Sequence, residues 1–172
     1  MISAILLAHE TPLSARTKLI VPRCLTSLID ACVQGVITDA ILVGPGGHLL
    51  DRIADDAGCN FIESHDPTQG VREAIKLSRN DHVLLLSTNY AVDQSFSEEA
   101  RDIFANNYRQ QAFILRSAPN TLITRLLPRS AAPAGIVASK EILRSTDYVL
   151  DIAHLSRKLS SSDFLTRARR LN

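Results

Sequence analysis

Short runs of apolar, often β-branched residues alternate along the chain with amphipathic segments, and this alternation limits the possible folds more than any other feature. The apolar runs are typical of buried strands, and they occupy residues 2–8, 40–43, 60–62, 82–86 and 112–115. Strands that alternate with helices of about 10 to 15 residues form a mainly parallel sheet with right-handed connections and helices on both faces. We therefore expect an α/β fold of three layers, with the strand at 82–86 near the centre of the sheet.

Helix signals occupy the segments between these strands. Pro22 suits the first turn of a helix that ends at Gly35, because proline lacks only an N–H that the first turn leaves unpaired. Gly58 follows a second apolar-periodic segment, at the position where many helices end with a left-handed residue. Ser95 and Glu98 have the spacing of a capping box, which predicts the start of another helix.

The last third of the chain gives weaker signals. Residues 134–138 are small and apolar, which suggests an edge strand. Helical signals resume at Lys140, Asp151 and Ser161. No repeat or long linker divides the chain, so its 172 residues are expected to form a single domain.

The net charge of +1 hides an uneven distribution. Residues 155–172 contain five basic residues and one acidic residue, which leaves residues 1–154 with a net charge of −3. Because Phe164, Leu165 and Ala168 add an apolar face, we expect a basic C-terminal helix that docks on the domain. Weak contact of this helix with an anionic membrane surface or a phosphate-rich partner is the alternative. A nucleic-acid partner is not expected, because the rest of the chain is acidic and only 5% of the residues are aromatic.

Three features of the sequence bear on the cellular location of the protein. No apolar run reaches the roughly 18 to 20 residues that a membrane-spanning helix requires. The sequence begins with a strand-like run and shows no basic leader, so a cytoplasmic location is the default expectation. Cys24, Cys32 and Cys59 form neither an even set nor a C-x-x-C pair, which suits a reducing compartment. Nothing in the sequence indicates an oligomeric state.

A glycine-rich turn follows the second expected strand. Ligands of open α/β sheets bind where the carboxyl ends of the strands form a crevice. The turn Gly44-Pro-Gly-Gly47 lies at such a position, and Gly44, Gly46 and Gly47 could place backbone N–H groups around a phosphate. An ordinary connection between a strand and a helix is the alternative, because glycine is selected there for its conformational freedom alone.

The loop after the first strand carries mixed charges. Ala8 ends the apolar run, and His9, Glu10, Arg16 and Lys18 follow it. An acid, a possible base and two cations near a strand end could bind an anionic nucleotide. The alternative is that the two cations are solvated residues ahead of a helix.

Neutral side chains follow the fourth strand. Ser87, Thr88 and Asn89 offer hydroxyl and amide oxygens, which would hold a hard divalent cation only weakly. Mg²⁺ or Mn²⁺ would bind here only if Asp93 and a bound diphosphate contributed. The five histidines have no metal-ligand spacing with one another or with cysteine, so the sequence predicts no metal site of its own.

A family pattern runs through residues 2–8, 24–43, 53–59, 70–75 and 81–86. In order and character these segments resemble the nucleotide-binding half of bacterial family 2 glycosyltransferases. The resemblance covers roughly residues 1–105 and leaves residues 106–172 as a reduced acceptor half. It implies a GT-A fold that binds a nucleotide-sugar or a nucleoside diphosphate. Ser87-Thr-Asn89 stands where that family carries a metal-binding D-x-D pair, and Gly44-Pro45 stands where it carries an acid.

Three functions are compatible with this resemblance. The leading hypothesis is sugar transfer from a nucleotide-sugar, with Arg16, Lys18 or Arg72 in place of metal charge on the diphosphate. The second is the nucleotidyltransferase branch of the same superfold, whose loop after the first strand is matched by Ser14, Arg16 and Lys18 but without its glycines. The third is a non-catalytic nucleotide-binding or interaction module, which the neutral side chains after the fourth strand favour.

Overall fold

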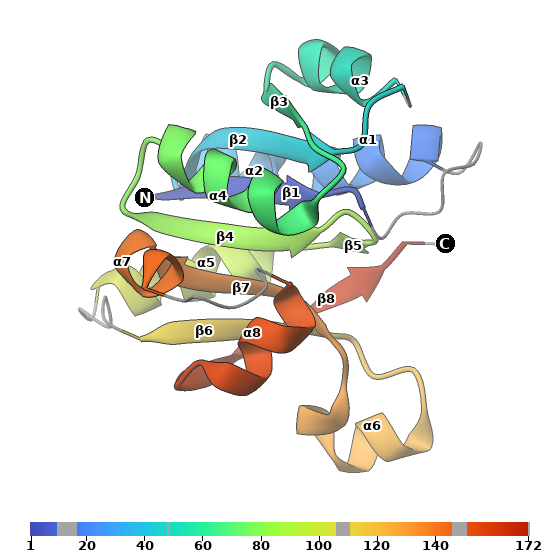
Figure 1. The fold of residues 1–172 in the computed structure, drawn as a ribbon. Helices are drawn as coiled ribbons and strands as arrows, with labels where there is room; N and C mark the ends of the chain where they lie inside the picture. The colour runs from blue at the N-terminus through green and yellow to red at the C-terminus, as the bar shows by residue number, and fades with distance from the viewer. Residues whose placement is uncertain (10–16, 48, 106–110, 146–150, 172) are drawn as a thin grey trace.

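The computed structural model describes residues 1–9, 17–47, 49–105, 111–145 and 151–171, and within them eight strands form one sheet (Figure 1). The strand order is β3-β2-β1-β4-β7-β6-β8-β5. The strands are β1 (Ile2–Leu7), β2 (Ile37–Gly44), β3 (Asn60–Glu63), β4 (His82–Ser87), β5 (Tyr90–Ala91), β6 (Ala112–Ser117), β7 (Pro133–Ser139) and β8 (Ser161–Arg170). The helices are α1 (Thr17–Ser27), α2 (Ile29–Val33), α3 (Leu50–Ala57), α4 (Pro67–Leu77), α5 (Gln94–Ala105), α6 (Leu122–Leu126), the 3-10 helix η1 (Pro128–Ser130), α7 (Lys140–Arg144) and α8 (Ile152–Lys158).

The sheet combines two pairing patterns. On the N-terminal side β1 is parallel to both β2 and β4, and β2 is parallel to β3. β7 then lies antiparallel between β4 and β6, while β8 is parallel to β6 and antiparallel to β5. The predicted α/β class and the central place of β4 are therefore confirmed, and the sheet is mixed in its C-terminal part.

Helices cover both faces of the sheet, as the strand periodicity requires. On one face Ala4 and Leu6 of β1 belong to a buried cluster with residues of α1, α2, α3 and α5. On the other face Ile5 and Leu7 belong to a cluster with residues of α4, α7 and α8. The three-layer prediction is thus confirmed. None of the described helices is both long and apolar enough to cross a membrane.

The first helical region differs from its prediction. Pro22 lies inside α1, which includes residues from Thr17 onward, and a break at Leu28 separates α1 from α2. Ile20, Val21 and Cys24 are buried on α1, and their packing offsets the hydrogen bond that an interior proline removes.

The segment at 134–138 is a strand, but its expected place at the sheet edge is wrong. β7 lies inside the sheet between β4 and β6. A Cβ on Gly135 would lie only 2.8 Å from the carbonyl oxygen of Leu85, so the glycine permits close pairing with the central strand. Pro133 is the first residue of β7, a position that a proline tolerates within a sheet.

The basic C-terminal helix is the largest error of the sequence prediction. Helix α8 ends at Lys158, and residues 161–170 form β8. Phe164 and Ala168 are both buried, and their spacing of four suggested a helix. A spacing of four also places two side chains on the same face of a strand. The register of β8 on β6 shifts between them, because Asp163 and Arg167 pair with Ile114 and Arg116, which are only two residues apart. The helix through which membrane contact was expected is therefore not formed.

Candidate functional site

The carboxyl ends of β1, β2, β3 and β4 meet at one edge of the sheet. Backbone hydrogen bonds join these ends: Ala8 donates to Val43 O over 2.9 Å, Ser64 donates to Gly44 O over 2.9 Å, and Thr88 donates to Leu7 O over 3.1 Å. We call this region the carboxyl edge. It brings together Ala8, His9, Gly44, Gly46, Gly47, Ser87, Thr88 and Asn89 from the predicted site.

His9 links two of the strand ends. Its Nε2 lies 2.7 Å from the carbonyl oxygen of Ser64, which follows β3. A carbonyl oxygen only accepts, so Nε2 carries the hydrogen and donates it. In the neutral imidazole Nδ1 is then an acceptor, and this atom is buried without a hydrogen-bond partner among the described residues. His9 therefore holds an unused acceptor at the carboxyl edge.

Glycine is favoured at each position of the turn for a different structural reason. A Cβ on Gly46 would overlap the carboxylate of Glu63, so this position requires glycine as long as Glu63 stays where it is. A Cβ on Gly44 would lie 2.6 Å from Leu50 Cδ1, which belongs to the core. Gly47 has a φ of +78° and lies in the left-handed region.

Glu63 is a residue of the site that the sequence reasoning missed. It is the last residue of β3, and its exposed carboxylate lies against Gly46. The available signal was its position: the expected strand stopped at Ile62, and Glu63 is the first residue after it at a strand carboxyl end. A carboxylate here can accept hydrogen bonds from hydroxyl or N–H groups of a ligand.

Hydrogen bonds hold the segment after β4 to neighbouring strand ends. Ser87 and Thr88 are buried, and Thr88 Oγ1 donates to Leu7 O over 3.1 Å. The carbonyl oxygen of Asn89 accepts from the backbone N–H of Leu171 over 2.8 Å. These neutral groups therefore support the edge of the sheet.

Asp93 caps the start of helix α5. Its Oδ1 accepts from the backbone N–H of Phe96 over 3.4 Å, at the start of α5. The helix begins at Gln94 after Asp93, so the N-cap predicted at Ser95 is two residues late. Within the described residues no three His, Cys, Asp or Glu side chains gather into a possible metal site. Neutral donors at 87–89 together with a helix-capping Asp93 do not fit a divalent cation.

One of the predicted cations, Arg72, lies away from the carboxyl edge. Lys18 is exposed in the first turn of α1. Arg72 lies on α4 beside Leu143 and Arg144, where these side chains line a cavity of about 240 Å³. α7 follows β7, whose last residue is paired with His82 at the start of β4, so Arg72 lies toward the opposite end of the strands. Glu10 and Arg16 lie outside the described residues.

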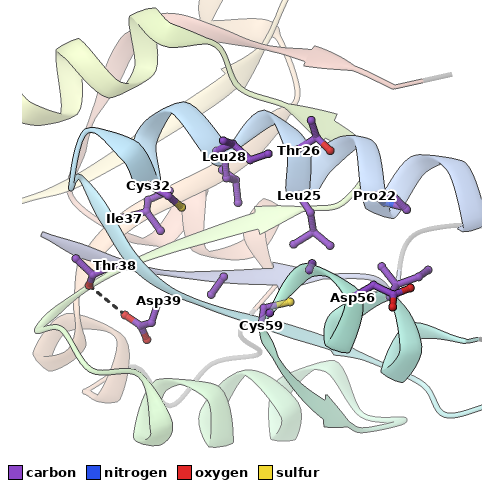
Figure 2. Close-up of a pocket in the computed structure, with 15 residues that line it drawn as sticks. Pro22, Leu25, Thr26, Leu28, Cys32, Ile37, Thr38, Asp39, Asp56 and Cys59 are labelled. Carbon is purple, nitrogen blue, oxygen red and sulfur yellow. Dashed lines mark hydrogen bonds between the residues drawn. The ribbon is translucent and has the colours of Figure 1, made fainter.

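A separate groove of about 820 Å³ lies between α1, α2 and α3, over the first half of β2 (Figure 2). Leu25 and Leu28 line it together with Cys32 and Cys59. Burial raises the pKa of both lining thiols, so they are protonated at neutral pH. The groove is mainly apolar and is distinct from the carboxyl edge.

No protein-family model and no curated protein matches the sequence. Solved structures match its fold. Glucosyl-3-phosphoglycerate synthase from Mycobacterium tuberculosis, solved with Mn²⁺, UDP and phosphoglyceric acid, superposes with a TM-score of 0.66 at 13% identity, over 100% of this chain and 71% of its own. A mannosyltransferase from Pyrobaculum calidifontis, solved with GDP-mannose and Mn²⁺, gives a TM-score of 0.71 at 8% identity, over 98% of this chain and 56% of its own.

A third similar structure is 4-diphosphocytidyl-2C-methyl-D-erythritol synthase from Anaerococcus prevotii, with a TM-score of 0.63 at 14% identity, over 99% of this chain and 89% of its own. At these identities the comparisons establish the fold. The chain has the GT-A-like α/β fold that is shared by nucleotide-sugar transferases and nucleotidyltransferases.

Proposed function

We propose that this chain binds a nucleotide-sugar, or the corresponding nucleoside diphosphate, at the carboxyl edge. The observation that carries the proposal is His9 Nδ1, a buried acceptor without a described partner at the end of β1. Similar structures that bind UDP or GDP-mannose share this fold. Ligands of such sheets occupy the crevice at the strand carboxyl ends. In this proposal residues 1–105 hold the donor and residues 106–172 form a reduced acceptor half.

Two side chains supply the nucleoside contacts in this proposal. His9 Nδ1 accepts a hydrogen bond from a ribose hydroxyl or a base N–H. The carboxylate of Glu63, next to Gly46, accepts from a second hydroxyl. Backbone N–H groups of the turn at 44–47 face the diphosphate.

Donor binding by these residues does not depend on a divalent cation. The side chains at 87–89 are neutral, and Asp93 caps α5. When a metal is bound in a related transferase it neutralises charge on the diphosphate. In this chain the backbone N–H groups of the turn at 44–47 would neutralise that charge. No described carboxylate pair takes the role of metal ligand.

Nucleotidyl transfer is the second candidate, and one observation favours it. The nucleotidyltransferase from Anaerococcus prevotii has the same fold, with a TM-score of 0.63 over 99% of this chain. This reaction would join a nucleoside triphosphate to a sugar phosphate and release pyrophosphate. Sugar transfer would instead release a nucleoside diphosphate.

Binding and turnover measured together test the proposal. Calorimetry with UDP, GDP and CDP and their sugars is expected to detect one nucleotide class, with affinity about tenfold weaker in His9→Phe. Glu63→Gln should weaken binding, because it removes the carboxylate of the site. Glu73→Gln removes the charge of an exposed side chain on α4 and should leave binding unchanged. Release of nucleoside diphosphate supports sugar transfer, and release of pyrophosphate supports the second candidate. Absence of binding by every nucleotide at about 1 mM would refute both.

A further inference from the structure

A second cavity, of about 800 Å³, lies away from the ends of β1 to β4, between β6, β8, η1 and α8. Arg116, Arg129 and Arg167 line it, and Asp163 is the one acidic residue among the described residues of its lining. Helix α8 packs on β7, and Figure 1 shows α6 standing outside the sheet. The proposed nucleotide site uses none of these residues.

Arg116 is fixed in the wall of the cavity. Its Nε donates to Asp163 Oδ1 over 2.9 Å, and its Nη1 donates to the carbonyl oxygen of Ala131 over 3.1 Å. Both partners of the ion pair are largely shielded, with 16% of the Arg116 side chain and 19% of the Asp163 side chain exposed. A guanidinium held in this way is positioned before any ligand arrives.

Arg167 stands beside Arg116 without an equivalent partner. The two residues are paired in register on the parallel strands β6 and β8, so their side chains leave the same face of the sheet. Nη1 of Arg167 is buried and has no hydrogen-bond partner among the described residues. A buried guanidinium N–H without an acceptor is unfavourable, and an anion that reaches it would remove this penalty.

The charge around the cavity is not balanced. Arg129 contributes a third cation, 93% exposed, whose Nε lies 3.9 Å from Asp163 Oδ2. Among the described lining residues, one carboxylate against three guanidinium groups leaves an excess of two positive charges. Arginine forks match the oxygens of phosphate groups in geometry and charge.

We propose that this cavity binds the phosphate group of a phosphomonoester, with Arg116 and Arg167 on its oxygens and Arg129 at the mouth. A phosphomonoester dianion matches the excess charge. Ser156, Ser161 and Ser162 line the remaining space and suit a hydroxyl-bearing body. The phosphate could belong to a soluble ester or to a lipid headgroup, because Leu127 of the lining is exposed, as is its neighbour Leu126.

Thermal unfolding of the full chain with glycerol 3-phosphate, against sodium chloride at equal ionic strength, tests the site. We expect Tm to rise by about 3 to 5 °C at ten times the dissociation constant. Arg167→Gln should weaken binding about tenfold, whereas Arg169→Gln, an exposed arginine of the same strand, should leave it unchanged. Arg129→Gln alters an exposed side chain, so it tests the site in a folded protein even if Arg167→Gln unfolds.

Sedimentation with phosphatidylcholine vesicles, with and without phosphatidic acid, distinguishes the two sources. Binding that requires phosphatidic acid and is competed by glycerol 3-phosphate assigns the group to a lipid. Stabilisation without such sedimentation assigns it to a soluble ester. Either result supports the site, and nucleotide binding at the carboxyl edge should be unchanged in Arg167→Gln. No stabilisation of the wild type, or equal stabilisation of the wild type, Arg167→Gln and Arg129→Gln, would overturn the proposal.

Discussion

Thr88 donates hydrogen bonds from both its side-chain hydroxyl and its backbone N–H to the carbonyl oxygen of Leu7, each over 3.1 Å. Thr88 is fully buried. The residue in the middle of Ser87-Thr-Asn89 therefore fastens the end of the central strand to the end of β1. A carboxylate at this position would face an oxygen inside the protein, so the local environment suits a hydroxyl donor and disfavours an acid.

Replacement of Thr88 tests this interpretation. We expect Thr88→Asp to lower the free energy of unfolding by about 3 kcal/mol, because it would bury a carboxylate against the carbonyl oxygen of Leu7. Thr88→Val keeps the shape and loses the hydrogen bond from the hydroxyl to Leu7 O, at a cost of about 1 kcal/mol. Urea denaturation measures both variants. Equal stability of the two would contradict the buried, acceptor-facing position of this side chain.

Glu99 is predicted to stabilise the bulge of β8. Its carboxylate accepts from the backbone N–H groups of Leu165 and Thr166 and from the hydroxyl of Thr166, over 2.6 to 2.8 Å. Glu99→Ala should cost about 2 kcal/mol of unfolding free energy, because it removes charge-assisted hydrogen bonds. Glu98→Ala is the matched control: Glu98 is exposed, and among the described residues its carboxylate accepts from Gln94 alone, a contact worth about 0.3 kcal/mol. Similar losses in both variants would argue against the role given to Glu99.

Two glycines of one turn should respond differently to alanine. Gly44→Ala places a methyl group against Leu50 and Ala8 in the core, so we expect a loss of about 1 to 3 kcal/mol. Gly46→Ala meets the exposed carboxylate of Glu63, which can rotate away at little cost in stability. The displaced carboxylate should weaken nucleotide binding. Chemical denaturation and calorimetry separate the effects, and a Gly46→Ala variant with unchanged affinity would remove Glu63 from the proposed site.

The pH dependence of stability should carry a contribution from Cys24. Burial raises the pKa of this thiol to about 12 from an ordinary value of 9.0. Between these values the folded state binds more protons than the unfolded state, so stability falls as the pH rises, by up to about 1.4 kcal/mol per pH unit. Cys24→Ala should show a shallower decline between pH 9 and pH 10.5. Parallel declines in the variant and the wild type would mean that the thiol ionises in the folded protein.

The N-terminal half was predicted well because its signals are local. The strand at 82–86 is apolar apart from His82, and Gly58 ends α3 with a φ of +68° as expected. The errors arise where tertiary contacts override a local pattern. The spacing of Phe164 and Ala168 fits a helix as well as a bulged strand, and the backbone pairing with β6 decides between them.

The site was predictable in position but not in its polar contacts. Ala8, Gly44 and Ser87 lie at the carboxyl edge because strand ends meet there in any sheet of this topology. The bond from His9 to Ser64 joins residues 55 positions apart, and no local pattern indicates it. Arg72 was placed at the site for its charge alone, whereas the direction of α4 carries it toward the other end of the strands.

The most direct test of the central claim is calorimetry of the wild-type chain with UDP, GDP and CDP sugars, each in EDTA and in excess Mn²⁺. The neutral side chains at 87–89 and the helix-capping Asp93 predict binding of one nucleotide class, with dissociation constants that agree within about twofold in the two conditions. Binding that requires Mn²⁺, or that Mn²⁺ tightens about tenfold or more, would contradict a metal-independent donor site.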